Sequence, residues 1–253
     1  MRWSYLMTAS LMTLRELIRR KIVILLLLLI PSLFYGVTHL TTDLFAIPFR
    51  LAAVEGEPGL MVPARHIGLV FMGLASAGLL AAFLSMNLIQ RNVQEIQRLI
   101  ICGYTSSEIA VSKLIVMFLV ILLLGCYIGS MLWIFFEPQN FLLVVIGFVM
   151  VGFVYGSYGL LVGTLLKGEL EGILLITVLA NIDVGWLQNP IFYAGALNKT
   201  IIRTLPAFFP SQLSIISAFS ELGAGRAFAG SLVYGGVMLV IALFIFWLKM
   251  RKR

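Results

Sequence analysis

The sequence contains few charged residues. Asp, Glu, Lys and Arg together make up only 11% of the 253 residues, whereas hydrophobic residues make up 61%. Because soluble globular domains have about 25% charged residues, this composition excludes a soluble enzyme or binding domain of ordinary make-up. It predicts an all-α, polytopic membrane protein.

Cysteine and histidine are also scarce. Cys102 and Cys126 are the two cysteines and have no paired spacing, so no disulfide framework is expected. The two histidines, His39 and His66, occur without an H-E-x-x-H pattern, which argues against a metal site. A G-x-x-x-x-G-K-[ST] phosphate-binding loop is absent as well. We therefore expect no catalytic residue, cofactor or metal on this chain, and any ATP chemistry belongs to another polypeptide.

The long apolar runs predict six transmembrane helices that together form one membrane domain. The predicted spans cover about residues 21–40, 67–89, 109–136, 141–166, 172–186 and 227–248. Residues 41–65 contain several prolines and acidic residues that interrupt any regular period, and they are expected to form a loop. Residues 187–226 are apolar but divided by prolines and glycines, which predicts short re-entrant or interfacial helices.

The basic residues are divided unevenly between the two sides of this six-span arrangement. Of the 18 Lys and Arg residues, 13 fall on the side of the termini and 5 on the other. Cytoplasmic segments carry the excess of Lys and Arg, so both termini are predicted to face the cytoplasm from the plasma membrane. The basic residues flank apolar runs, and this placement does not favour nucleic acid as the partner that the net charge of +7 would suggest.

Two amphipathic segments lie on the predicted cytoplasmic side. In residues 1–20, Met7, Leu11, Leu14 and Ile18 recur at helical spacing, a pattern typical of a helix in the membrane interface. Residues 91–102 place apolar side chains on one helical face and charged side chains on the other. This second segment is read either as a docking helix or as an ordinary interfacial loop helix.

The second amphipathic segment is followed by a predicted corner. Gly103 stands where a helix needs a left-handed closing residue. Thr105, followed three positions later by Glu108, forms a capping-box start for the next helix. The chain is therefore expected to turn at Gly103 and Tyr104.

These features together resemble ABC-2 type permeases, the membrane subunits of type V ABC exporters, over nearly the whole chain. Glu95, Gly103, Glu108 and Lys113 are the closest local correspondences. The resemblance implies an interfacial connecting helix at residues 1–20, a cytoplasmic coupling region at residues 91–108 and an outward re-entrant segment at residues 187–226. It further implies that cytoplasmic ABC ATPase subunits and a second permease subunit, identical or related, are the partners. The expected cargo is an amphiphile such as a drug, peptide, lipid or glycan.

Two sets of site residues are predicted, and the resemblance suggests the first set together with Phe208 and Phe209 of the second. Candidates for the interface with the ATPase are Arg91, Glu95, Arg98, Leu99, Gly103, Tyr104 and Glu108. Candidates for a pathway or gate are Asn181, Asp183, Phe208 and Phe209. Asp183 has an alternative interpretation as an interfacial residue that reaches lipid headgroups or pairs with Lys199 or Arg203, because a carboxylate that faces lipid is costly.

Two other function classes remain open from the sequence. An ATP-independent carrier or channel would use Asp183 and Asn181 as its polar site. An intramembrane hydrolase would use Ser157, although the surrounding residues lack the Gly-x-Ser-Gly order and no histidine follows. The glycines near Ser157 (Gly152, Gly156, Gly159 and Gly163) are explained by close helix packing.

Overall fold

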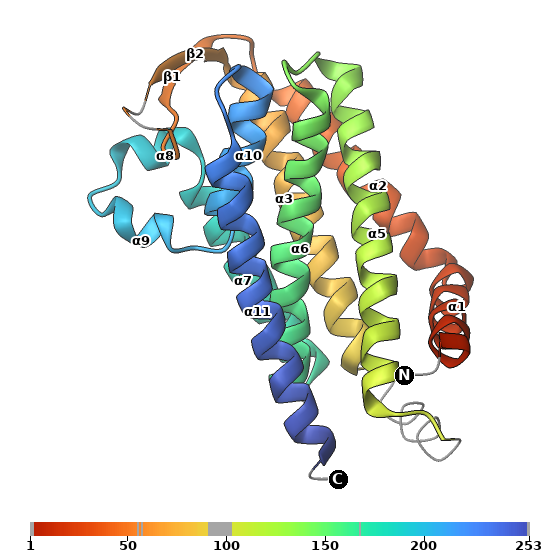
Figure 1. Cartoon of the computed structure of the whole chain (residues 1–253). Helices are drawn as coiled ribbons and strands as arrows, with labels where there is room; N and C mark the ends of the chain where they lie inside the picture. The colour runs from red at the N-terminus through yellow and green to blue at the C-terminus, as the bar shows by residue number, and fades with distance from the viewer. Residues whose placement is uncertain (1–2, 55, 57, 91–102, 167, 252–253) are drawn as a thin grey trace.

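The computed structural model describes residues 3–54, 56, 58–90, 103–166 and 168–251, and most of them are helical (Figure 1). The helices are α1 (Trp3–Arg19), α2 (Lys21–Thr41), α3 (Ala64–Gln90), α5 (Ser106–Phe135), α6 (Phe141–Leu165), α7 (Glu169–Ala180), the π-helix η1 (Asn181–Leu187), α8 (Pro190–Gly195), α9 (Lys199–Arg203), α10 (Phe208–Phe219) and α11 (Gly225–Arg251). Two strands, β1 (Ala46–Arg50) and β2 (Gly59–Pro63), complete the described elements.

Six helices are long and apolar enough to cross a membrane. They are Lys21–Thr41, Ala64–Gln90, Ser107–Phe135, Phe141–Leu165, Glu169–Leu187 and Gly225–Lys249. Each coincides within a few residues with a span predicted from the sequence, so the all-α, multi-pass character is confirmed. The short helices α8, α9 and α10 occupy residues 187–226, as the prolines and glycines there predict.

The prediction that residues 41–65 form only a loop is wrong. β1 and β2 pair antiparallel with Ala46 opposite Pro63 and Pro48 opposite Met61. In a two-stranded ribbon each strand is an edge, and a proline whose nitrogen faces away from the partner strand costs no ladder hydrogen bond. The Ala64 N–H donates to the Phe45 carbonyl and the Leu51 N–H to the Pro58 carbonyl, so in this register the Pro48 nitrogen faces outward. Pro48 therefore interrupts the sequence pattern without preventing the strand.

Helix α6 is the centre of the bundle and packs against α3, α5, α7, α10 and α11. Glycines allow these close approaches. A Cβ on Gly159 would lie 2.7 Å from the Cα of Ala82 in α3, and a Cβ on Gly152 would lie 2.8 Å from Cγ2 of Ile121 in α5. The glycine-rich face of α6 thus serves helix packing, as predicted.

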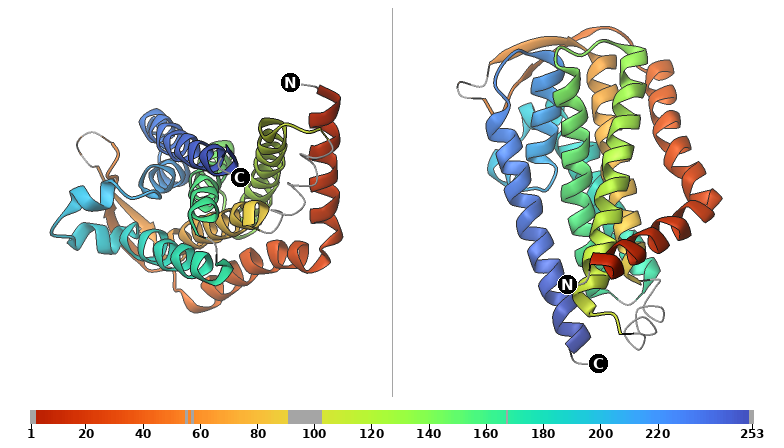
Figure 2. Two further views of the ribbon diagram at one scale, coloured as in Figure 1. Left: turned by 90° about the horizontal axis from the view of Figure 1, so that it is seen from below. Right: turned by 45° about the vertical axis from the view of Figure 1, so that its right-hand side comes forward.

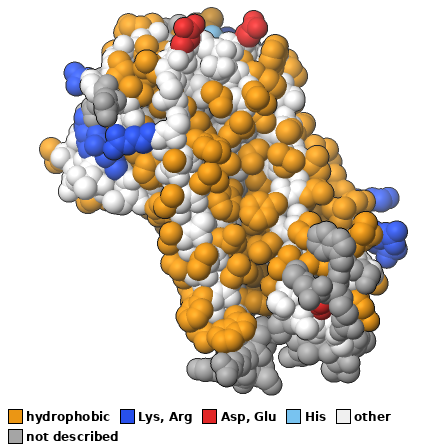
Figure 3. Space-filling model, in the orientation of Figure 1, with side chains coloured by type: hydrophobic (Ala, Val, Ile, Leu, Met, Phe, Trp, Pro, Cys, Tyr) orange, Lys and Arg blue, Asp and Glu red, His pale blue; other side chains and the backbone are white. Residues whose placement is uncertain are grey.

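The two ends of the bundle differ. Both termini lie at one end, and α1 runs crosswise to the other helices near that end, where it contacts α5 and α2 (Figures 1 and 2). The hairpin β1–β2 lies at the opposite end, and α8 and α9 flank the bundle on that half (Figure 1). Hydrophobic side chains cover the middle of the visible face, with charged side chains above and below them (Figure 3).

Candidate functional site

Asp183 is the centre of a buried polar cluster at the end of the fifth apolar helix. Its side chain is fully buried. Its Oδ2 accepts hydrogen bonds from the Tyr155 hydroxyl on α6 (2.7 Å) and from the backbone N–H of Ala207 (2.8 Å), and its Oδ1 accepts one from Nε2 of Gln188 (2.8 Å). Three donors therefore satisfy this carboxyl group without a cation.

The π-helix η1 explains how Gln188 reaches Asp183. In η1 the backbone N–H of Gln188 donates to the carbonyl oxygen of Asp183 five residues earlier (3.1 Å), which brings the two side chains to the same side. Nε2 of Gln188 also donates to the carbonyl oxygen of Ile202 (3.3 Å). Gln188 thus joins Asp183 to α9.

The third donor connects Asp183 to α10. Ala207 is the residue that precedes this 12-residue helix, and the first N–H groups of a helix carry a partial positive charge. A carboxylate oxygen 2.8 Å from the Ala207 nitrogen lies at the favourable end of that dipole. Asp183 consequently holds α6, η1 and α10 together through one side chain.

The four predicted pathway or gate residues do not form one group. Asp183 is joined through Ala207 to Phe208, which is buried and packs on Phe209 with ring centroids 5.2 Å apart. Asn181 is exposed, and its Nδ2 donates to the carbonyl oxygen of Thr177 on its own helix (2.8 Å). Asn181 therefore does not contribute to the cluster around Asp183.

The alternative in which Asp183 pairs with Lys199 or Arg203 or reaches headgroups is wrong, because Asp183 is buried and its partners are neutral donors. Nε of Arg203 instead donates to the Tyr193 hydroxyl (2.9 Å), and Nζ of Lys199 lies 5.3 Å from the centre of the Tyr193 ring.

Tyr155 and Gln188 belong to the cluster but are not among the site residues predicted from the sequence. Tyr155 resembles any tyrosine that packs in a helical bundle, and its pairing with Asp183 depends on how α6 and η1 lie against each other. The approach of Gln188 requires a π-helix, which periodicity of 3.6 residues does not reveal.

The predicted coupling region is described only from Gly103 onward. Arg91, Glu95, Arg98 and Leu99 lie outside the described residues, so their role stays a prediction. Gly103 has a φ of +90°, which confirms the left-handed turn.

The capping box that follows the turn is confirmed. Oγ1 of Thr105 accepts the backbone N–H of Glu108 (3.3 Å), and Oε2 of Glu108 accepts the backbone N–H of Thr105 (3.0 Å). These two bonds fix where α5 begins, directly after the corner.

The corner is in contact with several helices. The Tyr104 ring meets the Tyr5 ring of α1 edge to face, with centroids 4.9 Å apart. Glu108 is buried, and Nζ of Lys113, one helical turn beyond it, donates to the carbonyl oxygen of Leu88 near the end of α3. A displacement at the corner would therefore act on α1, α3 and α5 together.

Among the described residues there is no group of three or more His, Cys, Asp or Glu that could hold a metal ion. Comparison with models of known protein families gives no match, and neither does comparison with curated protein sequences.

Proposed function

We propose that this chain is the membrane-spanning permease subunit of an ATP-driven exporter of the ABC-2 type. The observation that carries the proposal is the capped corner at Gly103–Glu108, which is joined to α1 by Tyr104 and followed by the Lys113 link to α3. A helix end that is rigidly capped and connected to three elements is suited to receive a push from a partner protein.

The arrangement of the remaining elements supports the same proposal. α1 crosses the bundle at the end where both termini lie, as an interfacial connecting helix would (Figure 1). The short helices α8 to α10 and the hairpin lie in the opposite half, as an outward re-entrant segment would. In this proposal both termini face the cytoplasm, and the chain pairs with a second permease subunit, identical or related.

The mechanism is mechanical. A cytoplasmic ATPase pair closes on nucleotide and pushes residues 91–108, and the push reaches α1 through Tyr104 and α3 through Lys113. At the other end Asp183 ties α6 to η1 and α10, so a tilt of α6 pulls on the residues before Phe208. One two-state bundle thereby couples the ATPase side to an outer gate for an amphiphilic cargo.

The test is a mild-detergent purification of the tagged chain from native membranes, followed by mass identification and an ATPase assay. A stoichiometric ATPase subunit is expected. Glu95→Ala and Arg98→Glu should uncouple ATP hydrolysis from transport, whereas Glu137→Ala, at the opposite end of the bundle, should not. Full coupling in both cytoplasmic variants would count against this contact, and a lone chain without ATPase would reject the proposal.

The burial of Asp183 favours one second candidate, an ATP-independent carrier or channel, because a buried carboxyl group within an apolar helix is a common ion site. The orientation of Asn181 away from Asp183 removes half of the polar site that this candidate needs. Transport that follows an ion gradient and is lost in Asp183→Asn, with no ATPase present, would favour the carrier. A hydrolase would instead lose activity in Ser157→Ala.

A further inference from the structure

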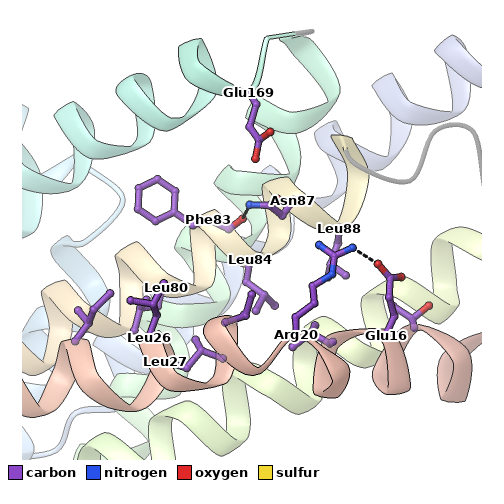
Figure 4. A pocket seen from close by; sticks show the side chains of 14 residues that line it. Glu16, Arg20, Leu26, Leu27, Leu80, Phe83, Leu84, Asn87, Leu88 and Glu169 are labelled. Atoms are coloured by element: carbon purple, nitrogen blue, oxygen red, sulfur yellow. Dashed lines mark hydrogen bonds and ion pairs between the residues drawn. The ribbon is translucent and has the colours of Figure 1, made fainter.

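A cavity of about 400 Å³ opens beside α3 at the end of the bundle where the termini lie (Figure 4). Its floor is α3, which packs against both α2 and α7. One wall is formed by α1 and α2 and the other carries Glu169, the first residue of α7. We call this cavity the α3 groove, and its volume is typical of a small-ligand site.

The α3 groove changes character along its length. Residues at one end are apolar, with Ile30 on α2 and Leu80 on α3. At the other end lie Glu16, Arg20, Asn87 and Glu169. From Leu80 to Asn87 the helix rises about 10 Å at 1.5 Å per residue. A molecule that fits this gradient has an apolar chain and a polar head.

Two carboxylates and one guanidinium lie at the polar end: Glu16 is ion-paired with Arg20, and Glu169 lies apart from this pair. Figure 4 shows Arg20 and Glu169 on opposite sides of the groove, with Asn87 between them. Arg20 forms an ion pair with Glu16, but a guanidinium carries five N–H donors and can bind a second acceptor. Glu169 is exposed and has no hydrogen-bond or ion-pair partner among the described residues. A ligand head with both an anionic and a cationic group would match these two side chains.

We propose that the α3 groove binds a zwitterionic phospholipid, with its phosphate at Arg20 and its ammonium group at Glu169. The apolar walls then hold the first part of one acyl chain, and the rest of the lipid lies in the bilayer because the cavity is too small for two chains. Asn87, whose Nδ2 donates to the carbonyl oxygen of Phe83 (3.2 Å), keeps its side-chain oxygen available for the ammonium group.

This site goes beyond the proposed function and does not depend on it. A specifically bound lipid would separate α2 from α7 whether the chain is an ATP-driven permease or a carrier. A binding experiment without nucleotide therefore tests the lipid site alone, and its failure leaves the ATPase question untouched.

The experiment is photo-crosslinking of the full chain in nanodiscs that contain phosphatidylethanolamine and phosphatidylglycerol. A trace of either lipid carries a diazirine on its acyl chain, and labelled peptides are mapped by mass spectrometry. Labels from the ethanolamine probe should concentrate on residues 23–30 and 80–88. At these residues the phosphatidylethanolamine probe should give about three times as much labelling as the phosphatidylglycerol probe, as expected for one exposed ion pair.

Matched variants separate the groove from the general lipid surface. Leu26 and Leu25 are both exposed on α2, but only Leu26 lines the groove. Leu26→Trp should fill the groove and reduce labelling at residues 80–88, and Leu25→Trp should not. Glu169→Gln should bring the ratio of the two probes to about one, because only the ammonium contact is lost. Arg20→Gln should reduce labelling by both probes.

Two results would overturn the proposal. Equal labelling by both probes that is unchanged in Leu26→Trp would mean that ordinary annular lipid covers the groove. Displacement of the probe by water-soluble phosphoethanolamine at a concentration no higher than that of the lipid would mean that the site binds a free head group and that the apolar walls contribute nothing.

Discussion

The Tyr155 hydroxyl donates a 2.7 Å hydrogen bond to the Asp183 carboxylate, and this bond joins the central helix α6 to the π-helical end of the fifth span. Both side chains are fully buried. Inside an apolar bundle a lost partner cannot be replaced by water, so the bond is expected to matter for stability and for the relative position of the two helices.

Asp183→Ala should destabilise the protein by about 2 kcal/mol, because the donors on Tyr155, Gln188 and Ala207 all lose their acceptor. Asp183→Asn keeps one acceptor oxygen and should cost less. Thermal unfolding in detergent, followed by loss of the monodisperse chromatographic peak, measures the difference.

The matched control for this prediction is Asn181→Ala, which removes an exposed amide two residues away on the same helix. A change within about 0.5 kcal/mol is expected there. Equal destabilisation by Asp183→Ala and Asn181→Ala would show that the buried cluster contributes no more to the free energy of unfolding than an exposed amide does.

Gly159→Ala should disrupt the contact between α6 and α3. The new Cβ would lie 2.7 Å from the Cα of Ala82, and backbone cannot yield as a flexible side chain can. The expected loss exceeds about 2 kcal/mol. Gly236→Ala on α11 is the control, because a Cβ there meets nothing within 4 Å, and it should be neutral or slightly stabilising. A stable Gly159→Ala protein would mean that α3 and α6 can separate without cost.

The spans and the capping box could be predicted because their signals are local. A run of about 20 apolar residues must cross the bilayer as a helix, and Thr105 and Glu108 recognise each other within one turn. The hairpin escaped prediction because its two strands have only five residues each and one contains Pro48.

The cluster around Asp183 could not be assembled from the sequence, since its donors are 28, 5 and 24 residues away along the chain. One of these separations is explained by the π-helix, and the other two depend on how α6 and α10 pack against η1. An apolar sequence with many equivalent helix faces does not specify that packing locally. The sequence does single out Asp183 itself, because an ionisable residue within an apolar run is rare.

Thr105→Ala should loosen the first turn of α5. The substitution removes the acceptor for the Glu108 N–H, and loss of an N-cap costs about 1 kcal/mol. Hydrogen exchange in residues 106–109 should accelerate by about fivefold for that cost. Ser107→Ala removes a hydroxyl that hydrogen-bonds to the Thr105 hydroxyl (3.1 Å) and leaves the capping oxygen of Thr105 in place, so it should accelerate exchange much less than Thr105→Ala. Equal exchange rates in the two variants would contradict the capping role.

Lys113→Met should weaken the connection between α5 and α3. Its ammonium group donates to the Leu88 carbonyl and is largely buried, so the loss of the bond is expected to cost about 1–2 kcal/mol. In the proposed exporter the variant should also hydrolyse more ATP for each molecule transported, because the corner no longer moves α3 with α5. Reconstituted vesicles allow both rates to be measured on one sample.

Lys249→Met is the control for this prediction, because Lys249 on α11 binds the Thr164 carbonyl at the end of α6 in the same manner, away from the corner. Because Lys249 is exposed whereas Lys113 is buried, its stability loss should be smaller, and its ratio of ATP hydrolysis to transport should stay unchanged. An identical change of that ratio in both lysine variants would show that general loosening, and not the corner, causes uncoupling.

The orientation of the bundle gives the last prediction. Arg19 on α1 and Glu137 between α5 and α6 are both exposed and lie at opposite ends of the structure. In a background with serine at positions 102 and 126, Glu137→Cys should react with a membrane-impermeant maleimide in intact cells, whereas Arg19→Cys should react only after lysis. The excess of basic residues at the termini predicts this result. Labelling of Arg19→Cys in intact cells would show that the termini face outward. An ATPase could then not reach the corner from the cytoplasm.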